Sequence, residues 1–171
     1  LRKQSAAIRS ELSSAGFTAK SGSHAVLPAV KGRKAHVVAG IDEAPDLWAL
    51  AHLPNALPTG TYVFGDDVET SVATALTVGW GLGGYRFNRY LSEPKRGPAK
   101  LVISKDVDRR EVEAQVDAVS LARDLINTPA ADMGPPELAE VAKQMAGTFG
   151  AKTRIVRGKE LKEMFPAVHA F

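Results

Sequence analysis

A glycine-rich stretch is the best candidate for ligand chemistry in this chain. Residues 79–84 read Gly-Trp-Gly-Leu-Gly-Gly, so Gly79, Gly81 and Gly84 fit the G-x-G-x-x-G pattern of dinucleotide-binding loops. The glycines of such a loop let the backbone approach a pyrophosphate, and an acidic residue farther along binds the ribose. Asp106 follows at about the position expected for that acid. The motif therefore predicts, as one alternative, a phosphate-binding turn.

The same stretch also fits a buried helix. Residues that can line a helix face recur through the glycines at helical spacing: Val72, Leu76, Trp80, Gly83 and Phe87. The helix that should follow a nucleotide-binding loop would have to end before Pro94, which is too short for a normal crossover. In a core helix, Gly79 and Gly83 would instead let another backbone pack closely. We favour this packing interpretation and keep nucleotide binding as the alternative.

The histidines show no pattern of a metal centre. None pairs with another at a spacing of four residues, and H-E-x-x-H is absent, so lone core or surface roles are expected. The four histidines are His24, His36, His52 and His169.

Asp66, Asp67 and Glu69 form the tightest carboxylate cluster. Clustered carboxylates can bind a hard cation. These lie just before the long apolar segment, where acids interact favourably with the N-terminal dipole of a helix, and we favour that structural role. The sequence contains no G-x-S-x-G elbow, no Walker-type loop and no cysteine. Residue chemistry alone therefore predicts no assembled catalytic site.

Composition narrows the class of protein further. The 171 residues are 44% hydrophobic and 24% charged, as in soluble globular proteins, and no apolar run is long enough to cross a bilayer. The start of the chain lacks the apolar core of a secretory signal. A net charge of +3 is spread along the chain, whereas a nucleic-acid interface needs a denser basic stripe. We therefore expect neither a membrane nor a nucleic-acid partner.

Interleaved helix and strand patterns predict an α/β domain over residues 3–104. Strands are expected at 17–20, 25–30, 35–41, 61–64 and 99–104, and helices at 3–15, 45–53 and 69–90. Helices between strands must cover the faces of the sheet. The predicted fold is therefore a mixed sheet flanked by helices.

A second unit is expected to begin with a helix at 108–127. Asp108 with Glu111 resembles a capping box, and Pro129 ends the helix because the residue before a proline is pushed out of the helical region. Beyond it we expect a helix at 135–149, a strand at 153–156, a helix at 158–165 and, at 167–171, an apolar stretch that opens another strand. One strand between helices lacks the neighbours that a sheet requires. We therefore expect a truncated second α/β domain.

The most specific stretch is residues 122–139, Ala-Arg-Asp-Leu-Ile-Asn-Thr-Pro-Ala-Ala-Asp-Met-Gly-Pro-Pro-Glu-Leu-Ala. It resembles the A-R-D-L-x-N-x-P signature that joins the two domains of leucyl (cytosol) aminopeptidases. Residues 16–20, 84–90 and 165–170 resemble the same family, in the same order. The resemblance implies a macro-domain-like amino-terminal domain at 1–107, a linker helix and junction at 108–134, and the beginning of a catalytic domain at 135–171.

The resemblance also implies an activity. The intact protein is expected to remove amino-terminal residues from peptides, using two divalent metal ions, Mn or Zn, held by Lys, Asp and Glu side chains. Those ligands would lie beyond Phe171, so no catalytic, cofactor-binding or metal-ligating residue is expected in this chain. We expect a cytoplasmic hexamer, in which this part has a structural or oligomerisation role and is inactive alone.

Two alternatives stay open. The amino-terminal part could be a binding module for ADP-ribose-like nucleotides or DNA, with residues 79–84 as its phosphate cradle. Within the signature, Asn127 and Asp132 fit turn and cap positions, although either could instead line a substrate entry or a subunit contact. We favour the structural roles.

Overall fold

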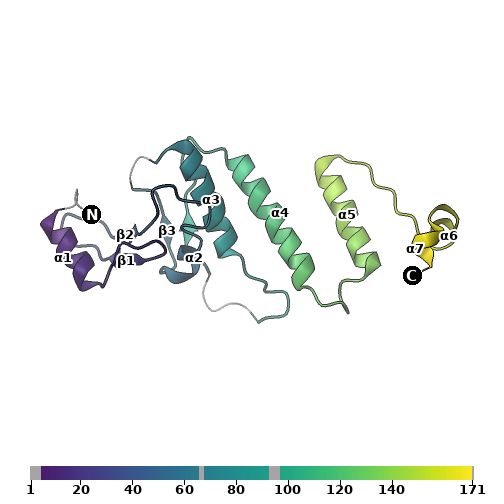
Figure 1. Ribbon diagram of the computed structural model, residues 1–171, viewed down its shortest axis with the longest axis horizontal. Coiled ribbons are helices and arrows are strands. Elements are labelled where there is room, and N and C mark those ends of the chain that lie inside the picture. Colours follow the sequence, from purple (N-terminus) through teal and green to yellow (C-terminus); the bar gives the residue numbers. More distant parts are fainter. Residues whose placement is uncertain (1–4, 66–67, 93–96, 171) are drawn as a thin grey trace. The chain divides into compact units, whose positions relative to one another are not determined.

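The computed structural model describes residues 5–65, 68–92 and 97–170 (Figure 1). The chain forms two compact units, Leu1–Arg123 and Asp124–Phe171. The domain boundaries expected at residues 107 and 134 stay predictions. Within the described ranges, no helix is both long and apolar enough to cross a membrane.

The first unit begins with a helix packed on a β-hairpin. Helix α1 (Ala6–Ser14) follows Ser5, whose Oγ accepts a hydrogen bond from the Ile8 N–H at 3.4 Å. Strand β1 (His24–Leu27) pairs antiparallel with β2 (His36–Ala39). Leu12 of α1 packs with Ala25 and Leu27 of β1 in a small core. Alternating strand residues face opposite sides, so the other face of the hairpin is left for the rest of the unit.

Helix α3 (Thr70–Gly84) is the centre of the first unit. The short helix α2 (Leu53–Ala56) precedes it, and strands β3 (Thr61–Tyr62) and β4 (Lys100–Leu101) form a two-stranded parallel sheet. One buried cluster joins α3 to α2 and consists of Leu50, Leu53, Leu57, Leu76, Trp80 and Ala99. A second joins α3 to α4 (Arg109–Asn127) and consists of Ala73, Val78, Leu82, Val107 and Val112.

The two long helices after α3 start and end where the sequence predicts. Asp108 Oδ1 accepts hydrogen bonds from the backbone N–H groups of Arg110 and Glu111 at 2.8 and 3.3 Å, so this predicted cap is confirmed. In the second unit, α5 (Pro135–Phe149) ends at Gly150, whose φ of 65° is the left-handed conformation that favours glycine. The chain continues through α6 (Lys159–Met164) and α7 (Pro166–His169).

The α/β class is confirmed, but the single mixed sheet is not observed among the described residues, which form two separate two-stranded sheets. Strands predicted at 17–20 and 153–156 are absent. Ala19 has a φ of 57°, which is incompatible with an extended strand. Residues 153–156 find no pairing strand in the described part of the second unit, so their β-branched pattern forms no ladder.

Two further predictions are wrong because of proline. The helix expected at 45–53 is replaced by turns, and α2 starts at Leu53 because Pro54 is accommodated in a first helical turn. The apolar stretch at 167–171 is not extended over its described residues. Pro166 opens the short helix α7 instead.

An ion pair fixes the hairpin turn on α1. Arg33 Nη1 donates to Glu11 Oε1 at 3.1 Å and Nη2 donates to Oε2 at 2.5 Å, while the Arg33 side chain is 18% exposed. This fork geometry is stronger than a single-point contact. The hydrogen bonds from Arg33 lower the pKa of the Glu11 carboxyl, against a smaller opposing effect of desolvation.

We expect the pair to make the fold acid-sensitive. The pKa of Glu11 is lower in the folded chain than its ordinary value of 4.5. The ion pair therefore stabilises the fold fully above pH 4.5, and this stabilisation is lost as the pH falls through the folded-state pKa. Glu11→Gln should therefore lower the Tm at pH 7 and flatten its dependence on pH below 4.5. The control is Glu140→Gln, which breaks an exposed pair with Lys143. Equal effects of the two substitutions would contradict the prediction.

Candidate functional site

The glycine-rich stretch lies inside helix α3, not in a loop. A Cβ atom at Gly79 would overlap the carbonyl oxygen of Leu47, and one at Gly83 would overlap that of Ala51. A Cβ atom at Gly81 would come within 2.6 Å of Val116 Cγ2 on α4. These three glycines let two neighbouring segments approach α3 more closely than any side chain allows.

This geometry confirms the packing interpretation and excludes residues 79–84 as a phosphate-binding turn. A nucleotide loop presents backbone N–H groups to the phosphate, whereas these residues belong to a continuous helix. Asp106, the expected ribose-binding acid, lies exposed in a turn after β4.

Side chains distant in sequence hold the C-terminal end of α3. Asn55 Nδ2 donates to the Gly83 carbonyl at 2.6 Å, and Arg123 Nη1 donates to the Leu82 carbonyl at 2.7 Å. Arg86 donates to Asn55 Oδ1 through Nε at 2.9 Å and Nη2 at 2.6 Å. The last carbonyls of a helix have no partner within it, so these contacts supply the missing donors. Sequence analysis missed this cluster because its donors are 28 and 41 residues from the carbonyls.

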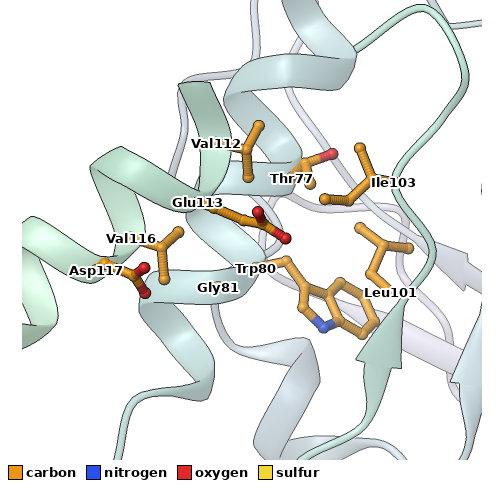
Figure 2. Close-up of a pocket in the computed structure, with 9 residues that line it drawn as sticks. All are labelled: Thr77, Trp80, Gly81, Leu101, Ile103, Val112, Glu113, Val116 and Asp117. Atoms are coloured by element: carbon orange, nitrogen blue, oxygen red, sulfur yellow. The ribbon is translucent and has the colours of Figure 1, made fainter. Parts of the chain in front are cut away.

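A pocket of about 170 Å³ opens beside α3 (Figure 2). Its lining residues come from α3, from β4 and the residues after it, and from α4: Thr77, Trp80, Gly81, Leu101, Ile103, Val112, Glu113, Val116 and Asp117. Thr77 Oγ1 donates to the Ala73 carbonyl at 2.6 Å, and Trp80 Nε1 donates to the Ala99 carbonyl at 3.0 Å. These wall groups are therefore satisfied inside the protein.

The chemistry of the pocket suits packing and not catalysis. Its walls are mostly apolar, and Figure 2 shows the Glu113 carboxylate near Trp80, with Asp117 beside Val116. A pocket of this size accommodates a single apolar group. Glu113 also pairs with Arg109 at 3.6 Å, so its charge is partly compensated.

Two of the four histidines come together. The rings of His24, on β1, and His52, just before α2, have centroids 5.4 Å apart. Burial, followed by the charge of His24, lowers the pKa of His52. His36 and His169 are exposed, and His36 Nδ1 lies 2.6 Å from the Lys34 carbonyl oxygen. The described residues contain no group of three or more potential metal-ligating side chains.

The remaining candidates occupy element ends. Asp66 and Asp67 lie outside the described residues, while Glu69 is at the N-cap of α3 and accepts a hydrogen bond from Ser71 Oγ at 2.5 Å. Asn127 is the last residue of α4. The backbone N–H of Asp132 donates to the Pro129 carbonyl at 2.8 Å. The roles proposed for Asn127 and Asp132 stay predictions.

Comparison with known families identifies the chain. Residues 1–104 match the family model for the M17 aminopeptidase N-terminal domain. The chain belongs to the M17 aminopeptidase family, which confirms the resemblance found in residues 122–139 and three other stretches.

Relatives agree with this assignment. The probable cytosol aminopeptidase of Corynebacterium efficiens is 30% identical over 93% of this chain and 34% of its own length. That of Aquifex aeolicus is 33% identical over 57% of this chain and 21% of its own length. The chain therefore spans between about a fifth and a third of these relatives.

Solved structures show the same fold. The cytosol aminopeptidase of Coxiella burnetii is 34% identical, with a TM-score of 0.86 over 99% of this chain and 37% of that protein. The bottromycin maturation enzyme BotP in complex with Mn is 26% identical, with a TM-score of 0.69 over 94% of this chain and 37% of that protein. The likeness thus covers both units of the present chain.

The close approach at α3 gives a stability prediction. Gly83→Ala should destabilise the first unit by about 2 kcal/mol or more, because the new methyl group overlaps backbone that cannot rotate away. Gly84→Ala is the matched control, since its Cβ would lie an ordinary 3.6 Å from Pro54 Cβ. Urea unfolding followed by tryptophan fluorescence measures both, because Trp48 and Trp80 are in the first unit. Equal midpoints for the two variants would contradict the packing role of Gly83.

Proposed function

We propose that this chain is the amino-terminal, non-catalytic portion of a metal-dependent aminopeptidase that removes amino-terminal residues from peptides. The observation that carries the proposal is the match of residues 1–104 to the N-terminal domain of the M17 aminopeptidases. Support comes from the TM-score of 0.86 with a cytosol aminopeptidase of which this chain spans 37%. The candidate site supports the same non-catalytic assignment, since its geometry suits close packing of helices and segments.

The surface of the second unit supports a role as the beginning of a larger domain. Among its described residues only Thr128 and Ala146 are buried. Phe149 is 75% exposed and Val168 is 62% exposed, although both are strongly apolar. Large apolar side chains exposed to this extent are often covered by further protein. We propose that a catalytic domain covers these side chains.

The proposal extends to cofactors and assembly. The catalytic domain would bind two divalent ions, Mn or Zn, which polarise the peptide carbonyl and supply a nucleophilic hydroxide. The Mn in the BotP complex supports metal dependence in related enzymes. A cytoplasmic hexamer is part of the same proposal, as are peptide substrates, a macro-like fold for residues 1–107 and a structural or oligomerisation role for this portion. The nucleotide- or DNA-binding alternative lacks its expected phosphate-binding turn, because residues 79–84 are helical.

Activity measurements test whether this chain is the non-catalytic portion of an aminopeptidase. The 171-residue chain alone should release no p-nitroaniline from Leu-p-nitroanilide with Mn²⁺, Zn²⁺ or Mg²⁺. A chimera that joins this chain to the remainder of the Coxiella burnetii enzyme should hydrolyse the substrate, because the two folds superimpose over 99% of this chain. That enzyme is the positive control. Chelator-sensitive hydrolysis by the chain alone would refute the assignment of a non-catalytic portion.

A further inference from the structure

The pocket beside α3 has apolar walls and an acidic side. All of its lining residues lie between positions 77 and 117, so it belongs wholly to the first unit. Trp80, Leu101 and Ile103 supply apolar surface. The indole N–H of Trp80 already donates to the Ala99 carbonyl, so a ligand meets the ring and not its donor. These walls therefore suit the apolar body of a small molecule.

Helix α4 forms the acidic side of the pocket. Glu113 and Asp117 are one helical turn apart, so both side chains lie on the same face of α4, and both line the pocket. Figure 2 shows the Glu113 carboxylate directed toward the space beside Trp80. Glu113 pairs with the exposed Arg109, whereas Asp117 forms no salt bridge with the lysines, arginines and histidines that the structure describes. Negative charge is therefore left beside an apolar cavity.

We propose that this pocket binds a small organic ammonium, in which an –NH₃⁺ group is carried on an apolar body of the size of a benzyl or isobutyl group. The apolar body packs against Trp80, and the ammonium lies beside the carboxylates of Glu113 and Asp117. The pocket volume of about 170 Å³ suits such a body, since an apolar cavity of about 150 Å³ holds a benzene molecule. Indole attracts cations more strongly than the other aromatic side chains, which also favours an ammonium.

The charge of the pocket disfavours other classes of ligand. Glu113 and Asp117 repel phosphates and carboxylates, and they contribute no attraction to a neutral molecule. An organic ammonium can come from two sources, a free amine or the amino terminus of a peptide that begins with an apolar residue. A free amino acid is disfavoured because its own carboxylate faces the same repulsion. The inference concerns the first unit alone and does not depend on the proposed peptidase activity.

NMR titration of the ¹⁵N-labelled 171-residue chain at pH 7 tests the proposal. Benzylamine should shift the indole N–H signal of Trp80 in a saturable way, with a Kd of about 1 mM, while the signal of Trp48 stays in place because Trp48 does not line the pocket. Benzyl alcohol has a similar apolar body without the charge and should bind about fivefold more weakly. Both measurements use the unchanged chain, so they do not depend on any variant folding.

Leucinamide separates the two sources of the ammonium. It carries a free amino group beside an isobutyl side chain, as the amino terminus of a leucine peptide does. Saturable binding of leucinamide as well as benzylamine extends the ligand class to peptide amino termini. Binding of benzylamine alone restricts the class to free amines.

Substitutions on α4 test the acidic side. Glu113→Gln and Asp117→Asn each remove one charge at a nearly constant shape, so each should weaken benzylamine binding about two- to fivefold, and the double variant roughly tenfold. Glu111→Gln is the matched control, because Glu111 is on the same helix and does not line the pocket. The proposal is overturned if benzylamine leaves the Trp80 signal in place, if benzyl alcohol binds as tightly, or if Glu111→Gln weakens binding as much as the double variant.

Discussion

The fold of the first unit depends on how closely backbone can approach α3. Gly79 and Gly83 lie one helical turn apart. A carbonyl oxygen of the 47–51 segment lies so close to each of them that a side chain there would overlap it. The helix can then contribute to two cores at once, with Leu76 and Trp80 in one and Val78 and Leu82 in the other. Without this approach, the segment that leads into α2 would be displaced and both cores would open.

Glycines inside a helix weaken it intrinsically, so its end must be held from outside. Each interior glycine costs roughly 0.5–1 kcal/mol relative to alanine, and α3 ends without a left-handed glycine cap, since Tyr85 is extended. Asn55 and Arg123 supply donors to the terminal carbonyls instead. Arg123 also lies over the Tyr85 ring, 5.3 Å from its centroid. The family signature that contains Arg123 thus contributes a contact to the helix that the glycines make possible.

Local rules could predict the long helices but not the sheets. The apolar period, Asp108 and Gly150 act within a few residues of one another, so α3, α4 and α5 were foreseeable from sequence. A strand exists only where a partner pairs with it. Residues 153–156 have strand-like chemistry and no ladder, whereas the two-residue strands β3 and β4 pair across 37 intervening residues. Their pairing depends on tertiary contacts that the sequence pattern does not carry.

The candidate site likewise contains features that the local sequence predicts and features that depend on tertiary contacts. The packing role of Gly79 and Gly83 was foreseeable because the apolar period passes through them, which a phosphate loop would interrupt. The meeting of His24 and His52 was not, because neither has a ligand-like spacing and only the hairpin brings β1 to α2. Residues 122–139 resemble the family signature in their order, and the described residues there make helix-end and turn contacts. The family assignment therefore rests on the match over residues 1–104, whereas the contacts made by residues 122–139 are local packing interactions.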